Sequence, residues 1–191
     1  ICFGGAKHRN RNFKGYVDSV YLGVFNKKLM PPEPWFDEDL VKISEDSDLN
    51  FRIRKNGGHV YLSSDIKVDH YPRENLRKFY TLCYNYGFGR GLFYYKHKTF
   101  SAPRQLVLPL AGILIAAFLL LSFFNIIFLY FLYLLIVAYL FIIFSSSLMF
   151  SYINRNKLLK IFVCFFLAHV GWTLGFYKSL WDNIILKNKP L

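Results

Sequence analysis

Three carboxylic acids lie close together in the polar half of the chain: Glu45, Asp46 and Asp48. Acids are common in the first turn of a helix, so helix capping alone accounts for one or two of them. A carboxylate held there stays ionised, which is the state a general base needs to accept a proton from a hydroxyl group. The spacing therefore indicates a candidate catalytic carboxylate, with capping as the alternative interpretation.

A helix must position these acids, and the residues that follow them predict one. Leu49 and Ile53 recur at the helical period, basic residues occupy the expected last turn, and Gly57-Gly58 predicts the end. Upstream, residues 16–25 predict a strand or a buried loop entry, and residues 59–71 predict one or two short strands. Together these segments indicate short elements of an α/β domain.

Residues 75–95 predict a second helix, rich in aromatic and basic side chains. A helix of this composition directly before an apolar segment is typical of one that lies in the membrane interface. The alternative is a solvated helix that packs on the polar domain.

The composition limits the class of the whole protein. A chain of 191 residues with 54% hydrophobic and 20% aromatic residues is not disordered, and three cysteines do not make a disulfide-stapled domain. The net charge of +12 suits anionic lipid or nucleic acid, but the basic residues flank apolar segments, so we expect no nucleic-acid partner. No secretory leader is recognisable before the polar half and the first residue is Ile1, so we expect part of a longer protein.

The second half of the chain predicts membrane helices. No charged residue occurs from Gln105 to Phe144, and a bilayer core takes about 20 helical residues. Two spans are therefore expected, over about 105–124 and 126–146, with a turn at Asn125. A buried helix pair in a soluble protein is the alternative, but no other part of the chain could cover so much apolar surface.

A third apolar segment, over about 161–182, predicts a further helix. Gly171, Gly175 and Ser179 recur every four residues, which is typical of close helix packing in membranes, although glycine is also common there without that role. His169 interrupts the segment and could face other helices. The positive-inside rule places the polar half in the cytoplasm, and a full third span would leave Lys187 and Lys189 outside. A re-entrant or interfacial segment therefore stays open beside a full span.

The motifs of the polar half resemble a known family when they are taken in order. The runs GYVDSVYLGVFNKKLM, WFDEDLVKISEDSDLNFRIRKNGGHVYLSSDIKVDHYPRENLRKF and YNYGFGRG are similar to family-2 glycosyltransferases of GT-A fold, in particular the membrane-bound succinoglycan-biosynthesis type. The resemblance covers residues 4 to 104 and extends to AHVGWTLGFYKSL. It implies a partial α/β GT-A domain, the C-terminal half over residues 1–104, followed by an all-α transmembrane segment of two to three helices over residues 105–191.

The resemblance also implies roles for particular residues. Asp46 matches the catalytic base of an inverting transfer, with Glu45 beside it. Asp18 and Gly23 match the loop that closes on the donor sugar and the acceptor. His70 matches a ligand of the family's Mg²⁺ or Mn²⁺ ion, for which imidazole is suitable, with a purely structural histidine as the alternative.

Arg73 and Arg90 match positions near the donor diphosphate, which a guanidinium group binds well. The family's nucleotide-binding strands and Asp-x-Asp metal ligands would precede Gly4-Gly5, so the chain alone is expected to be inactive. The implied partners are a nucleotide-sugar donor, a lipid-linked or glycan acceptor, and membrane lipid. A non-catalytic membrane scaffold, or a subunit of a split glycosyltransferase, is the alternative function.

Overall fold

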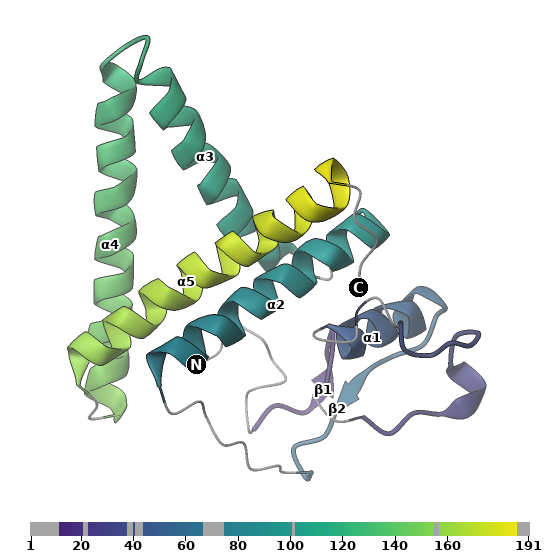
Figure 1. Cartoon of the computed structure of the whole chain (residues 1–191). Coiled ribbons are helices and arrows are strands. Elements are labelled where there is room, and N and C mark those ends of the chain that lie inside the picture. The colour runs from purple at the N-terminus through teal and green to yellow at the C-terminus, as the bar shows by residue number, and fades with distance from the viewer. Residues whose placement is uncertain are drawn as a thin grey trace.

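The computed structural model describes residues 12–20, 23–37, 40, 44–66, 75–100, 102–154 and 157–186. Five helices and two short strands make up most of this part of the chain (Figure 1). In order these are β1 (Gly15–Tyr16), α1 (Glu45–Lys55), β2 (Tyr61–Leu62), α2 (Leu76–His97), α3 (Val107–Leu121), α4 (Ile127–Asn154) and α5 (Leu158–Leu180). Short 3₁₀ helices lie at Lys27–Leu29 and Pro103–Leu106, and a π-helical turn at Trp181–Ile185 continues α5.

Helix α1 is the centre of the polar half, and its predicted bounds are confirmed. Leu49 is fully buried and Ile53 nearly so, which is the face that the helical period predicts. The helix ends as expected at the glycine pair: Gly57 has a φ of 83°, and the N–H of Gly58 donates to the carbonyl of Ile53 at 2.9 Å.

The described residues contain less strand than predicted over 16–25, whereas 59–71 contains the expected short strand, β2. In the described residues the only sheet is the antiparallel pair β1–β2, in which Tyr16 faces Tyr61. Of the residues described in the run 16–25, only Tyr16 lies in a strand, and Val24 is fully exposed. A β-rich composition makes a strand only where a partner strand is available, and β2 offers two residues. The α/β GT-A half-domain therefore remains a prediction beyond this small sheet.

Helices α3 and α4 form a hairpin with a turn at residues 122–126. Asn125 lies in this turn, and its side-chain oxygen accepts a hydrogen bond from the N–H of Ile127 at 2.9 Å. Phe118 of α3 stacks on Phe128 and Phe131 of α4. A polar residue inside an apolar run thus caps the second helix of the pair.

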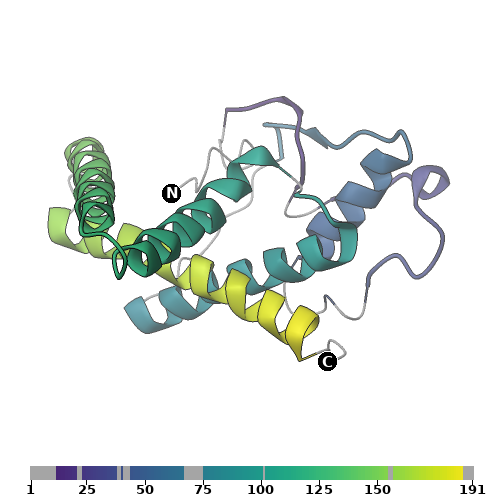
Figure 2. The same cartoon turned by 90° about the horizontal axis from the view of Figure 1, so that it is seen from above.

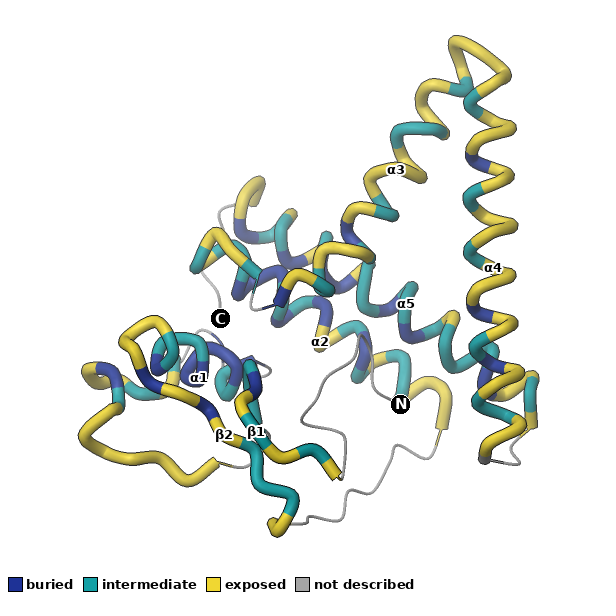
Figure 3. The backbone as a smooth tube through the Cα atoms, turned by 180° about the vertical axis from the view of Figure 1, so that it is seen from behind, coloured by how far each residue is buried: buried dark blue, intermediate teal, exposed yellow. Residues whose placement is uncertain are grey.

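Three helical segments are long and apolar enough to cross a membrane: Pro103–Leu121, Ile127–Ile153 and Leu158–Ile185. Most of the hairpin surface is exposed in the described structure (Figure 3), including Phe123 at 82% and Phe124 at 88%. Nothing in the described polar half covers this apolar surface, which disfavours a buried soluble helix pair.

Helix α5 lies beside α2, where small residues bring the two backbones together (Figure 1). A Cβ atom added to Gly87 would collide with the carbonyl oxygen of Trp172, and one added to Gly175 would collide with that of Tyr84. The predicted small-residue face of the last helix is therefore a packing face, and its partner is α2. His169 lies on another side of α5, with Nδ1 3.3 Å from the hydroxyl oxygen of Tyr139.

Candidate active site

Asp48 is fully buried and is surrounded by cationic groups. Its Oδ2 accepts a hydrogen bond from Nε of Arg52 at 2.8 Å, and its Oδ1 lies 2.5 Å from Nε2 of His97. Nζ of Lys96 is 3.8 Å from the same Oδ1. A buried carboxylate with several such partners has a structural role, because it joins α1 to the last turn of α2.

Arg52 extends this connection to the proline-rich loop before α1. Its Nη1 donates to the carbonyl of Pro34 at 3.2 Å, and its Nη2 donates to the carbonyl of Trp35. Lys96 forms an ion pair with Asp37 of the same loop. Lys96 and His97 were not predicted as site residues, because their only signal in the sequence is a pair of basic residues directly after the predicted helix at 75–95.

Asp46 differs from Asp48 in its surroundings. It is partly buried, and the one hydrogen bond described for its carboxylate comes from the N–H of Ser47, 2.6 Å from Oδ1. Nη2 of Arg90 donates to the hydroxyl of Ser47 at 2.9 Å, which brings α2 to the same turn of α1. Within the described part of the chain, no hydrogen bond to the second oxygen of Asp46 is found.

The electrostatics of Arg90 show which groups surround it. Burial lowers the pKa of Arg90, and the negative charges of Asp46 and Asp18 oppose that shift, whereas the charge of Arg104 adds to it. Two predicted site carboxylates and two guanidinium groups therefore lie within electrostatic range of one another. An arginine remains protonated in such a place, so the cluster keeps its cations at neutral pH.

Asp18 reaches this cluster from the loop after β1. Its Oδ2 accepts a hydrogen bond from Nη2 of Arg104 at 2.7 Å, and Arg104 lies in the short helix that leads into α3. The neighbouring Ser19 accepts a hydrogen bond from the side-chain amide of Asn50 in α1 at 3.2 Å. The loop after β1 is thereby held against α1 and the start of the first membrane-length helix.

Glu45 is the other predicted catalytic acid. Its Oε2 is buried and has no hydrogen-bond partner in the described structure, and the same holds for the hydroxyl of Ser44. Buried polar atoms are normally paired, and the described contacts do not explain why this carboxylate oxygen beside Asp46 has no partner.

The remaining predicted site residues are Gly23, His70 and Arg73. Gly23 is exposed, and the three atoms nearest to a Cβ added there belong to the ring of Phe25. His70 and Arg73 lie outside the described residues. The described part of the chain contains no group of three or more His, Cys, Asp or Glu side chains that could hold a metal ion, so no metal-dependent step is derived from it.

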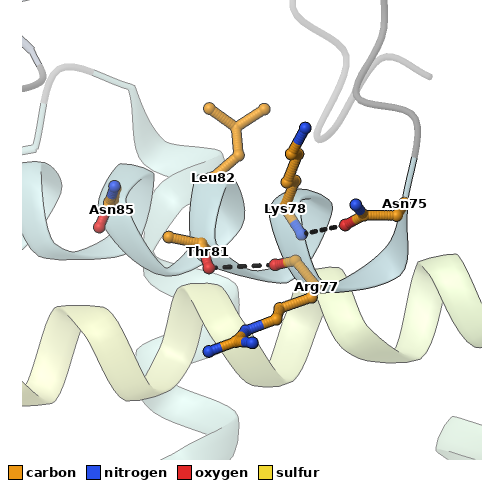
Figure 4. Close-up of a pocket in the computed structure, with 6 residues that line it drawn as sticks. All are labelled: Asn75, Arg77, Lys78, Thr81, Leu82 and Asn85. Atoms are coloured by element: carbon orange, nitrogen blue, oxygen red, sulfur yellow. Dashed lines mark hydrogen bonds between the residues drawn. The ribbon is translucent and has the colours of Figure 1, made fainter.

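A separate hollow of about 520 Å³ lies along the first half of α2 (Figure 4). It is lined by Asn75, Arg77, Lys78, Thr81, Leu82 and Asn85. Two of the polar side chains that line it make hydrogen bonds within α2 or its N-terminal cap. The side chain of Asn75 accepts from the N–H of Lys78, and the hydroxyl of Thr81 donates to the carbonyl of Arg77. None of the predicted site residues that the structure describes lines this hollow.

Comparison with known proteins gives one informative relationship. The chain is 24% identical over 180 residues to the succinoglycan biosynthesis protein ExoA of Rhizobium meliloti (strain 1021). The match covers 94% of this chain and 53% of that protein, so the chain spans about half the length of the curated relative it matches. It confirms the resemblance to the succinoglycan-biosynthesis type that the motifs indicated. No protein-family model matches the chain, and no solved structure matches it.

Proposed function

We propose that this chain is part of a membrane-anchored, inverting family-2 glycosyltransferase that transfers a sugar from a nucleotide-sugar to a lipid-linked or polysaccharide acceptor. The single observation that carries the proposal is the cluster of Asp46, Asp18, Arg90 and Arg104, which combines an available carboxylate with two cations. Similarity to a protein of succinoglycan biosynthesis supports it independently.

In this proposal Asp46 is the general base. It lies in the first turn of α1, and its described hydrogen bond occupies one oxygen. Asp46 would accept the proton of the acceptor hydroxyl as that oxygen attacks the anomeric carbon of the donor. Asp48 cannot take this role, since Arg52 and His97 hold both of its oxygens.

The cations of the cluster would act on the other side of the reaction. Negative charge develops on the leaving diphosphate, and preorganised guanidinium groups stabilise such charge in a partly dry site. Arg90 is suited to this role by its burial beside Asp46, and Arg73 is a further candidate from the resemblance. A Mg²⁺ or Mn²⁺ ion, with His70 among its ligands, remains an expectation from the resemblance.

The position of the cluster next to the apolar helices suits a lipid-borne acceptor. Arg104 binds Asp18 and stands just before α3, so the proposed site lies at the junction with the membrane segment. We infer a multi-pass protein of the cell membrane with the site on its cytoplasmic face, because the polar half carries most of the basic residues.

The test is a transfer assay on membranes that contain the full-length protein, with a panel of radiolabelled nucleotide-sugars. Once a donor is found, Asp46→Asn is expected to reduce transfer by about 10²- to 10⁴-fold and to leave donor binding intact. Asp65→Asn is the matched control, since Asp65 is exposed and pairs only with Lys14 and Ser63 in the described structure. Transfer at the wild-type rate in Asp46→Asn would remove Asp46 from the role of base. Absence of transfer with every donor would favour the scaffold.

A further inference from the structure

The arrangement of α2 and α5 bears on how the chain enters the membrane. The two helices run in the same direction with their backbones in contact: Gly171 lies against Tyr80, and further along Gly91 lies against Phe176 and Ser179. A Cβ atom on Gly91 would be 2.6 Å from the carbonyl oxygen of Phe176. Because these contacts run along α2 from Tyr80 to Gly91 and along the second half of α5, the second half of α5 shares the position of α2 relative to the bilayer.

Helix α2 is fixed to the polar half at its C-terminal end. Arg90 binds Ser47 at 2.9 Å, and His97 lies 2.5 Å from buried Asp48. Its N-terminal end is also connected to the polar half, because α2 follows β2 after residues 63–75. If α2 crossed the bilayer, this connection and its charged residues would have to reach across it as well, and charged side chains at membrane depth are costly.

The surface of α2 agrees with this placement. Arg77, Lys78 and Thr81 are exposed around the polar hollow of its first half (Figure 4), and Lys96 stands near its other end. Charged side chains at membrane depth are rare and are normally paired inside a helix bundle. The first half of α2 therefore faces water.

Helix α5 runs across the α3–α4 hairpin instead of along it (Figures 1 and 2). The hydroxyl of Tyr177 donates to the carbonyl of Pro109 at 2.5 Å, and the rings of Phe165 and Phe150 lie 6.5 Å apart. Pro109 is about 20 Å from the turn at residues 122–126, at 1.5 Å per helical residue. These contacts lie far from the tip of the hairpin, as expected if the hairpin alone extends into the bilayer.

The outer face of α5 has the composition of a helix that lies in the interface. Its exposed apolar side chains recur every seven or eight residues and so form one stripe: Leu159, Phe166, Leu174 and Trp181. Lys160 and Lys178 are exposed at one edge of this stripe. An apolar stripe with a tryptophan and flanking lysines suits the boundary between acyl chains and headgroups.

We propose that α5 lies in the membrane interface beside α2 and does not cross the bilayer, so that α3 and α4 are the two spans and the end of α5 stays on the side of the polar half. The surface that contacts lipid is the stripe of α5, and its partner is the headgroup region of an anionic bilayer. This placement keeps Lys187 and Lys189 on the same side as the other basic residues, as the positive-inside rule favours. It does not depend on transferase activity.

The test compares three positions by cysteine labelling in sealed membrane vesicles of one orientation. Cys2, Cys83 and Cys164 are first replaced by alanine, and the reporters are Asp65→Cys in the polar half, Phe124→Cys in the hairpin turn and Leu186→Cys after α5. A membrane-impermeant maleimide is applied before and after permeabilisation. Leu186→Cys is expected to label with Asp65→Cys, and Phe124→Cys to label from the opposite side.

Two results would overturn the proposal. Leu186→Cys could label together with Phe124→Cys, which would make α5 a third span. It could also stay unlabelled until detergent is added, which would place the end of α5 inside the hydrocarbon. Ile185→Cys, at a position 56% exposed, repeats the measurement if the first variant fails to accumulate.

Discussion

Nε2 of His97 lies 2.5 Å from Oδ1 of Asp48, and the two residues are 49 positions apart in the chain. The histidine ring also packs on Phe51 and Phe93, with ring centroids 4.7 and 4.6 Å away. A buried charge and an aromatic cluster thus meet at one point between α1 and α2. This contact holds the candidate base in α1 against the helix that supplies Arg90.

Removal of the Asp48 carboxylate should destabilise the protein strongly. In Asp48→Ala, the groups of Arg52 and His97 lose their acceptor inside the structure, and breaking a buried pair in this way costs about 3–5 kcal/mol. Thermal unfolding of the detergent-solubilised protein measures the loss. Asp65→Ala, which removes an exposed carboxylate, should unfold at the wild-type temperature; equal losses in the two variants would contradict a special role for Asp48.

The aromatic cluster predicts a second stability difference. Phe93 is 1% exposed and its ring meets that of Phe51 edge to face at 5.1 Å, so Phe93→Ala should cost about 3–5 kcal/mol. Phe36 is 51% exposed and is the matched control, for which Phe36→Ala should have a much smaller effect. Thermal unfolding of the two variants measures this difference in stability. Equal losses in Phe93→Ala and Phe36→Ala would show that Phe93 is not at the core of the α1–α2 contact.

The glycines of α5 should differ in their tolerance of a methyl group. Gly175→Ala would push against the backbone of Tyr84, and overpacking of this kind costs about 1–3 kcal/mol. In Gly171→Ala the new Cβ would lie 3.1 Å from the ring of Tyr80 and 3.2 Å from its carbonyl oxygen, which small adjustments can relieve. Gly175→Ala should therefore unfold at a lower temperature than Gly171→Ala, and the reverse order of the two unfolding temperatures would contradict the described α2–α5 contact.

Arg104 offers a test of the proposed site that is separate from Asp46. Arg104→Gln removes the partner of Asp18 at a partly exposed position, so the free energy of unfolding should change by about 1 kcal/mol or less. Transfer by the full-length protein should nevertheless fall at least tenfold, since the loop that carries Asp18 loses its anchor. Lys14→Gln, which removes the exposed partner of Asp65, is the control. Unchanged transfer in Arg104→Gln would exclude the Asp18 loop from the site.

Much of the helical structure was predictable. The bounds of α1 follow from its acids, its apolar period and the glycine pair, and the turn at Asn125 follows from one polar residue in a long apolar run. The strand over residues 16–25 was less predictable, because strand formation depends on a partner elsewhere in the chain. The interfacial and the packed interpretations of α2 were offered as alternatives, and the described helix packs on both α1 and α5.

The candidate site was also predictable only in part. The acids at the start of α1 were visible in the sequence, whereas Arg104, Lys96 and His97 were not, since each acts through a contact with a distant segment. Residue type and spacing alone did not distinguish Asp46 from Asp48, and only the family resemblance pointed to Asp46. Both lie in the same helical turn, and only the packing of α2 shows that Asp48 is enclosed by cations.

The sequence by itself determined where the helices lie and that the second half has the composition of a membrane segment, because helical period and apolar content are local properties of the chain. Only the tertiary structure showed that Asp48 is the structural acid, that Arg90 lies near Asp46 and that Arg104 binds Asp18. It also showed that α5 packs on α2. Those relationships depend on contacts between residues far apart in the chain, which form only when the helices pack.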